Sequence, residues 1–206
     1  MPKTQDEIIA LISHGSPEFT PGSKAVYSNS NYILLGYIIE EVCHKPYQGV
    51  VYDRITSKAK LWDTHYGGKT NTDRGECYSY SFTNDWIKEP EADLSILGAA
   101  GALVSTPSDL NKFIEALYGR KLIPAQYLTK MQDINDGYGM GMLPYTYGTR
   151  TAYGHHGSLD GFNTILEYFP EEGIAISYCS NGQVAPVNDI ISQVVNIVFD
   201  SESMKQ

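Results

Sequence analysis

The sequence of 206 residues is poor in cysteine, in basic residues and in long apolar runs. Its 3 cysteines are an odd number without metal-ligand spacing, which argues against a disulfide framework and a zinc site, so we expect no cofactor. Lysine and arginine total 15 against 24 acidic residues, and the formal net charge of −9 disfavours nucleic acid and anionic membrane surfaces as partners. No apolar run approaches the ~20 residues of a membrane-spanning helix. The first residues lack the basic and apolar stretches of a secretory signal, and the compartment stays open.

Aromatic residues are plentiful, with 16 Tyr, 6 Phe and 2 Trp, so the chain has ample material for a folded core. Apolar spacing predicts helices first and strands later, which is typical of an α+β fold. The expected helices cover residues 4–13, 31–43, 47–57, 106–118, 124–131 and 186–199, and the expected strands cover 138–144, 151–158, 162–169 and 174–180. Residues 62–97 read as a long loop. We therefore expect a mostly helical region over 1–137, and antiparallel strands with a terminal helix over 138–206, as one unit.

Several local signals support these assignments. Thr4 precedes an acidic first turn and is a good N-cap, and Thr106-Pro107 is a strong helix start. Helix 31–43 reads as buried, with Asn29 or Ser30 able to cap it. The small apolar residues of 97–104 predict close backbone packing, and the turn at 170–173 predicts a hairpin between the last two strands.

The first segment with chemical potential is Tyr27-Ser28-Asn29. A free phenol has a pKa near ~10, so about one in a thousand is ionised at pH 7, and a tyrosine base needs a neighbouring cation. The Asn29 amide can hold a carbonyl or an amide group of a substrate. The alternative interpretation is that Tyr27 merely packs while Asn29 caps the helix that follows.

The second segment is His155-His156-Gly157-Ser158, on a predicted strand. A histidine with a pKa near ~6.5 is partly charged at neutral pH, and a glycine lets a ligand approach the strand backbone closely. A backbone N–H at Ser158 can stabilise an oxyanion that forms in the transition state. The alternative is one core histidine beside one surface histidine.

These two segments and the small-residue stretch with its helix at 98–113 occur in an order that resembles the serine β-lactamase, penicillin-binding protein and esterase superfamily, in its class C-like branch. The resemblance implies a β-lactamase/transpeptidase-like fold and a site in which Tyr27 is the general base and Asn29 and His155 hold the substrate. It further implies that His156, Gly157 and Ser158 line the substrate and oxyanion side. His155 stands where many relatives carry a lysine, which favours esters or D-amino peptides over penicillins.

The nucleophile of that superfamily is missing at its expected place. The family carries it in an S-x-x-K motif well before the tyrosine, and the 26 residues before Tyr27 contain none. The literal match Ser57-Lys58-Ala59-Lys60 falls about 30 residues too late, so we interpret it as chance and keep a relocated nucleophile as the alternative. The resemblance then implies that the chain is the C-terminal portion of such a fold, without its N-terminal strands and its nucleophile helix. Its complete form would hydrolyse an amide or ester through an acyl-serine intermediate, and this chain alone would be inactive.

Loss of the first strands would expose the apolar edge of strand 174–180, which is a pairing hazard. A homo-oligomer, a domain swap or a second chain would cover that edge. Two further functions therefore stay open, namely a binding module that holds an acyl ligand or peptide without cleaving it, and an interaction protein. The substrate, whether a β-lactam, a D-amino peptide or an ester, stays open as well.

Overall fold

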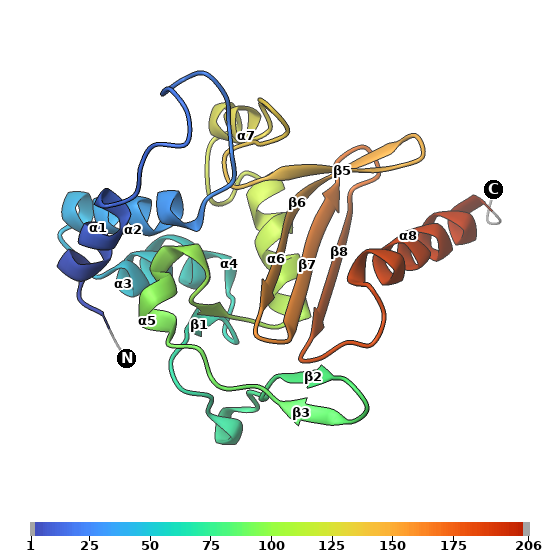
Figure 1. Cartoon of the computed structure of the whole chain (residues 1–206). Coiled ribbons are helices and arrows are strands. Elements are labelled where there is room, and N and C mark those ends of the chain that lie inside the picture. Colours follow the sequence, from blue (N-terminus) through green and yellow to red (C-terminus); the bar gives the residue numbers. More distant parts are fainter. Residues whose placement is uncertain (1–2, 204–206) are drawn as a thin grey trace.

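A four-stranded antiparallel sheet lies at the centre of the computed structural model, which describes residues 3–203 (Figure 1). Its strand order is β5-β6-β7-β8, so each strand pairs with its neighbour in sequence. The strands are β5 (Leu143–Tyr147), β6 (Arg150–Leu159), β7 (Phe162–Phe169) and β8 (Ile174–Ser180). Helix α6 (Pro107–Tyr118) packs on one face of the sheet and α8 (Val187–Ser203) on the other. The α+β fold class is confirmed.

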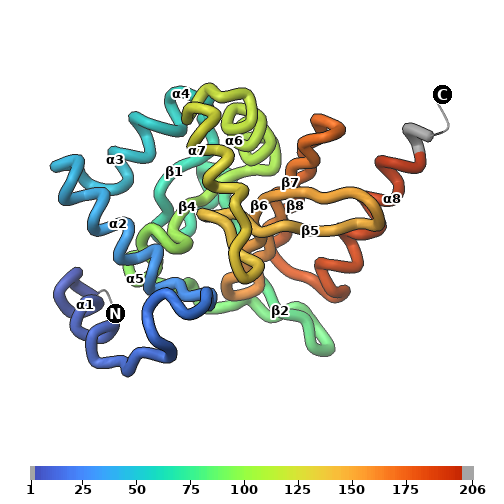
Figure 2. The backbone as a smooth tube through the Cα atoms, turned by 90° about the horizontal axis from the view of Figure 1, so that it is seen from above, coloured from blue at the N-terminus to red at the C-terminus, as the bar shows by residue number. Residues whose placement is uncertain are grey.

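The remaining elements form a mainly helical part beside the sheet, and Figure 2 shows them from above. The helices are α1 (Gln5–Ser13), α2 (Asn29–Cys43), α3 (Tyr47–Val51), a π-helical turn (Tyr52–Thr56), α4 (Ser57–Ala59), α5 (Leu94–Leu97) and α7 (Ala125–Met131). Two short 3₁₀ turns cover Thr72–Arg74 and Gly98–Ala100. Two small antiparallel pairs join β1 (His65–Tyr66) to β4 (Leu103–Val104) and β2 (Tyr80–Phe82) to β3 (Trp86–Lys88). The region 62–97, expected to be a loop, thus contains short strands and helical turns.

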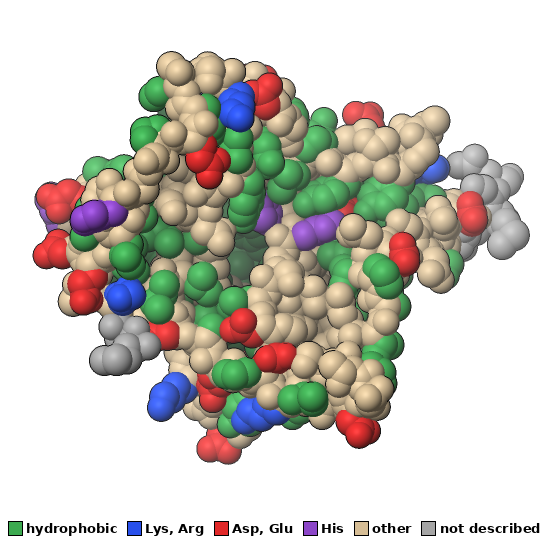
Figure 3. Space-filling model, in the orientation of Figure 1, with side chains coloured by type: hydrophobic (Ala, Val, Ile, Leu, Met, Phe, Trp, Pro, Cys, Tyr) green, Lys and Arg blue, Asp and Glu red, His purple; other side chains and the backbone are tan. Residues whose placement is uncertain are grey.

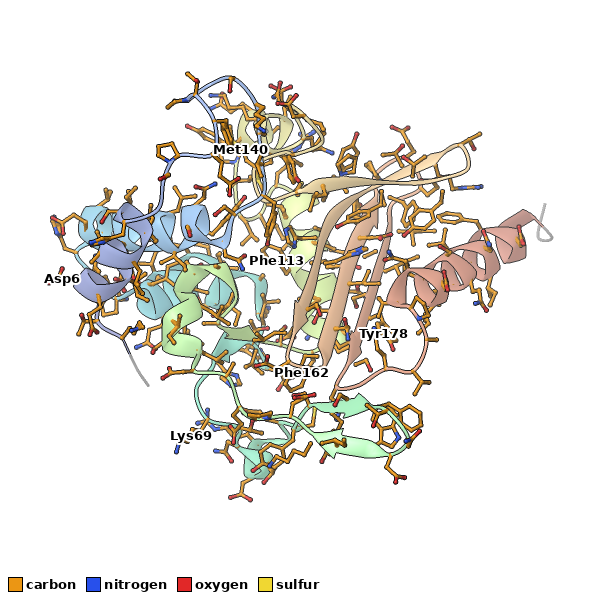
Figure 4. The ribbon with its side chains drawn as sticks, in the orientation of Figure 1. Asp6, Lys69, Phe113, Met140, Phe162 and Tyr178 are labelled. Atoms are coloured by element: carbon orange, nitrogen blue, oxygen red, sulfur yellow. The ribbon has the colours of Figure 1, made fainter. Side chains whose placement is uncertain are left out.

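Each face of the sheet has its own apolar cluster, because alternate residues of a strand point to opposite sides. The α8 face is built from Ala152, Ile165, Phe169, Ile176, Ile191, Val195 and Phe199, with Tyr178 (labelled in Figure 4) packed against it. The α6 face is built from Ile114, Leu117, Leu128, Met142 and Leu166, with Phe113 (also labelled) at its border. The sheet is therefore covered on both sides by helices that are far apart in sequence.

The start of α6 is held by a buried carboxylate. Thr106 caps the helix by accepting a hydrogen bond from the backbone of Asp109, as its sequence predicts. The Asp109 side chain is completely buried and accepts hydrogen bonds from the Asp63 N–H (2.8 Å), the Thr64 hydroxyl (3.1 Å) and Lys112 Nζ (2.8 Å). It thereby ties α6 to the chain that enters β1.

Helix α2 is less buried than its apolar pattern predicts. Only Ile33 and Gly36 are buried among its described residues, while Leu35, Ile38 and Val42 are exposed. The buried contact is close, because a Cβ added at Gly36 would lie 2.6 Å from the Cβ of Ala99. The predicted close packing of the small-residue stretch is confirmed, whereas the prediction of a buried helix is wrong for Ile38 and Val42. Helical periodicity identifies the apolar side chains but not which of them meet a partner.

The strand predicted at 138–144 is displaced in the structure. Residues Asn135 and Tyr138 pair across a tight turn, and Gly137 and Gly141 adopt positive φ, which interrupts an extended strand there. Extended pairing begins only at Leu143, where β5 joins β6. The strands over 162–169 and 174–180 have the predicted bounds.

Strand β8 is an outer strand of the sheet, with β7 as its ladder partner among the described residues. Its far edge carries the apolar and neutral residues of IAISYCS. Between residues 3 and 203, the helices are too short or too polar to traverse a bilayer.

We expect Asp109→Asn to lower the free energy of unfolding at pH 7 by about 1–3 kcal/mol, because it weakens charge-assisted hydrogen bonds to a buried group. Burial alone would raise the pKa of Asp109, but the bonds from Lys112, Asp63 and Thr64 outweigh burial and lower it. A carboxylate with a lowered pKa stabilises the fold above its unfolded pKa of ~3.9 and loses this contribution as the pH falls through the folded value.

The stability difference between wild type and Asp109→Asn should therefore shrink as the pH falls below ~3.9. Urea unfolding at several pH values measures it, with exposed Asp133→Asn as the matched control. Equal stability of wild type and Asp109→Asn at pH 7 would contradict this role of Asp109.

Candidate active site

Three side chains from distant parts of the chain meet beside β6. The Tyr27 ring lies 6.0 Å from the His155 ring and 6.4 Å from the Tyr138 ring, measured between centroids. The Tyr27 hydroxyl donates a hydrogen bond to Asn29 Oδ1 (3.2 Å). Tyr27 and Asn29 are exposed and His155 is half-buried, so the group borders open space. In Figure 3, histidine side chains lie beside a hollow near the middle of the molecular face.

The segment with Tyr27 is held in place by the connection between α7 and β5. Asp136 Oδ2 accepts a hydrogen bond from the Ala25 N–H (2.8 Å), and the two segments run side by side in Figures 1 and 2. Ser28 is the N-cap of α2, with an extended backbone and without a side-chain capping bond. Asn29 is the first helical residue. Its Oδ1 accepts a hydrogen bond from the Tyr27 hydroxyl and does not cap the helix. The interpretation of Asn29 as a cap is therefore wrong.

His155 is held by its own strand. Its Nδ1 lies 2.6 Å from the carbonyl oxygen of His156. Because a carbonyl oxygen can only accept, Nδ1 must carry the proton of this hydrogen bond. Burial lowers the pKa of His155, and the neighbouring charge of His156 lowers it further, which outweighs the backbone bond that favours the charged ring. The neutral ring then has a bare Nε2, which is a hydrogen-bond acceptor.

The outer edge of β6 is open next to these residues. Strand β5 pairs with residues 150–154 of β6 and leaves 155–159 uncovered on that side. The two-residue turn Asp160-Gly161, with φ of 45° and 87°, joins Leu159 to Phe162 as partners. Hydrogen-bonded and non-hydrogen-bonded pairs alternate from such a turn, so the N–H of Ser158 points away from β7 toward the open edge.

Gly157 leaves additional room at this edge. Within 4 Å, a Cβ added to Gly157 would meet only the Cβ of Thr164, at 3.9 Å, and both Gly157 and Ser158 are exposed. A ligand beside His155 can thus reach strand backbone without meeting a side chain at position 157.

The ring of His156 lies on the other face of the sheet, away from Tyr27. Its Nε2 is 2.8 Å from Glu167 Oε1, and the ring stacks on Tyr145 at 4.0 Å between centroids and 9° between planes. The structure therefore unites Tyr27, Asn29 and His155 beside the backbone of Gly157 and Ser158, and leaves the His156 ring out of this group. Adjacent strand residues face opposite sides, which separates the two histidines.

Sequence reasoning did not single out Glu167, which is completely buried on the α8 face. A signal was present: Glu167 stands between Ile165 and Phe169 in the alternating pattern of β7, where apolar residues are expected. An acidic residue at such a position needs buried partners, and it has them in His156 and Tyr147.

The S-x-x-K match lies at the end of a helical segment. Ser57 opens the short α4, its hydroxyl donates to the carbonyl oxygen of Asp53 (3.3 Å), and Lys60 is the left-handed C-cap residue. The superfamily motif stands at the start of a helix, so this geometry agrees with a chance match.

The architecture, an antiparallel sheet covered by helices on both faces, is that of a β-lactamase-type α+β protein. The comparison with protein families agrees, since the model of the family "Beta-lactamase" matches residues 1–194. The chain belongs to the beta-lactamase family.

Among known proteins, the chain is similar in sequence to two curated relatives and in structure to a solved amidase. It is 31% identical over 203 residues to "Putative penicillin-binding protein PbpX" of Bacillus subtilis (strain 168), covering 94% of this chain and 50% of that protein. It is 27% identical over 122 residues to "Teichoic acid D-alanine hydrolase" of Staphylococcus aureus (strain MRSA252), covering 58% of this chain and 30% of that protein. The D-amino acid amidase from Ochrobactrum anthropi SV3 is similar in structure, with a TM-score of 0.84 and 25% identity over 98% of this chain and 65% of that one. The chain thus spans half or less of these two relatives' length.

We expect the His155 ring to titrate with a midpoint below the ordinary value of ~6.5, because burial disfavours its charged form. Since the unfolded chain then binds the proton more readily, stability contributed by His155 is present above ~6.5 and declines as the pH falls toward the folded pKa. NMR titration of the ring protons, assigned with His155→Gln, measures the midpoint. A midpoint at or above 6.5 would show that burial does not govern this group.

Proposed function

We propose that this chain carries the base and the substrate-binding groups of an acyl-transfer site for amides or esters. Tyr27 is the general base, Asn29 and His155 hold the substrate, and the N–H of Ser158 stabilises the oxyanion, beside the open backbone of Gly157. The observation that carries the proposal is the meeting of Tyr27, Asn29 and His155 at the uncovered edge of β6. The His156 ring faces the other side of the sheet, so in this proposal it does not touch the substrate.

The proposed substrates lack a carboxylate beside the scissile bond. A neutral His155 offers no positive charge to the carboxylate of a penicillin, and burial keeps it neutral near pH 7. The similarity to the D-amino acid amidase of Ochrobactrum anthropi supports amides or esters of D-amino acids. β-Lactams are correspondingly weaker ligands in this proposal.

The nucleophilic serine, in this proposal, comes from a segment outside the 206 residues, together with a cation that activates Tyr27. The contacts described for the Tyr27 ring and hydroxyl are with Asn29, Tyr138 and His155, none of which supplies a fixed positive charge. A phenol without a neighbouring cation is protonated at pH 7 and is a poor base. The reaction then proceeds through an acyl-serine intermediate only when that segment is present.

The chain alone should bind substrate analogues without cleaving them. We expect D-phenylalanine amide to shift the backbone NMR signals of Asn29, His155 and Ser158. We further expect D-phenylalanine p-nitroanilide and a chromogenic cephalosporin to be hydrolysed no faster than in buffer. Asn29→Ala should weaken binding of the amide about 2- to 10-fold, the value of roughly one hydrogen bond. Asn188→Ala, an exposed substitution on α8, is the matched control.

Mass spectrometry after incubation with these substrates should find no acylated serine on the chain. A covalent adduct on Ser57, or turnover that disappears in Tyr27→Phe, would overturn the assignment of the nucleophile to another segment. Absence of any shift at the β6 edge would overturn the proposed binding site.

A fusion tests the catalytic role of Tyr27 directly. We expect turnover of D-phenylalanine p-nitroanilide when the part of PbpX that precedes its similar region is fused ahead of Met1. In that fusion, Tyr27→Phe should lower kcat by about 100-fold or more, the usual contribution of a general base. Tyr138→Phe, which alters the neighbouring ring, should retain most of the activity. A fusion in which Tyr27→Phe is as active as the parent would contradict the base assignment.

A further inference from the structure

A buried carboxyl group, that of Glu167 in β7, lies on the face of the sheet opposite to the His155 ring. Glu167 is completely buried, and its Oε1 accepts a hydrogen bond from the Tyr147 hydroxyl (2.8 Å). The same oxygen lies 2.8 Å from His156 Nε2. Since Oε1 acts as an acceptor for the Tyr147 hydroxyl, His156 donates to it through Nε2. One carboxylate oxygen thus joins a side chain of β5 to a side chain of β6.

This arrangement costs stability. The other oxygen, Oε2, is buried and has no hydrogen-bond partner among the described residues. A buried carboxyl group with one unsatisfied oxygen is less favourable than an apolar side chain of similar volume, which would pack against Ile165 and Phe169 on the same face. Because Glu167 does not fit the apolar pattern of this face, we look for a role other than packing.

The His156 ring is held on two sides. Glu167 holds its Nε2, and the Tyr145 ring stacks on its face at 4.0 Å and 9°. The β6–β7 ladder sets the direction of the His156 peptide, and the restraint on the ring from both sides limits the rotation that remains. The carbonyl oxygen of that same residue accepts the Nδ1–H of His155 at 2.6 Å.

We propose that Glu167 is a positioning residue: by holding the His156 ring, it orients the His156 carbonyl that keeps His155 in the Nδ1–H tautomer. The substrate-facing histidine then offers Nε2 as an acceptor. An acceptor at this place selects ligands that present an N–H donor, such as an amine or amide, and disfavours a carboxylate. This last consequence rests on the proposed function, whereas the tautomer of His155 does not.

The experiment is ¹⁵N NMR of the histidine rings in the full 206-residue chain at pH 7, which distinguishes the tautomers without any turnover. Wild-type His155 should show the Nδ1–H pattern. Glu167→Met removes the acceptor with little change in volume, and His156→Phe keeps the stacking ring but removes the donor. In both variants the His155 signals should lose the single Nδ1–H pattern and average between the two tautomers.

Two conservative variants serve as controls. Glu167→Gln retains an acceptor for His156 Nε2 and should restore the wild-type His155 pattern. Tyr147→Phe removes the other hydrogen bond to Glu167 and should leave that pattern unchanged. Thermal unfolding of each variant shows whether it is folded.

An Nε2–H pattern of His155 in the wild type would overturn the proposal whatever the variants do. Retention of the wild-type pattern in folded Glu167→Met or His156→Phe would overturn it too. Because these readouts need no substrate, a failure to bind D-phenylalanine amide would count against the proposed function alone.

Discussion

The register of β6 against β7 is the constraint on which the site depends. Because side chains alternate along a strand, this register sends His155 toward Tyr27 and His156 toward Glu167. It also determines that the N–H of Ser158 points to the open edge instead of into the ladder. A shift of β6 by one residue would exchange the two histidines between the faces of the sheet. The short turn at Asp160-Gly161, where both residues have positive φ, sets that register.

Burial has opposite consequences for the two buried carboxylates. Asp109 accepts hydrogen bonds from a lysine, a hydroxyl and a backbone N–H, and it anchors α6 to the chain that enters β1. Glu167 keeps one oxygen unsatisfied and connects to the strand that carries His155. The first is accounted for by structure alone, since its partners offset its desolvation. The second is bonded to His156, the residue that follows His155 in β6, and so can influence the place where His155 stands.

The candidate site has hydrogen-bonding groups but no cation next to Tyr27 among the described residues. It has an acceptor at His155, an amide at Asn29 and an open backbone edge. The chain belongs to the beta-lactamase family, and it spans half or less of the length of the two curated relatives. Ile38 and Val42 of α2 are exposed, and β8 has no strand partner opposite β7 among the described residues.

Local patterns were enough to predict much of the fold. The Thr4 and Thr106 caps, the two strands from Phe162 to Phe169 and from Ile174 to Ser180, and the close packing at Ala99 follow from short-range sequence signals. The strand predicted at 138–144 begins later in the structure, because Gly137 and Gly141 adopt positive φ in a turn. Hydrophobic patterning does not report such backbone angles. Similarly, the exposure of Ile38 depends on which elements pack against α2, and the spacing of apolar residues does not predict those elements.

By itself, the sequence determined the α+β class, the family motifs and the types of group that could meet, because these depend on local propensity and residue chemistry. Only the tertiary structure decided that the Tyr27 and His155 rings lie 6.0 Å apart while the His156 ring turns away to a buried carboxylate. The reason is that packing brings the Tyr27 ring to His155, more than 100 positions away in the chain, while pairing of β6 with β7 brings Glu167 to His156. Neither contact follows from the periodicity of the sequence.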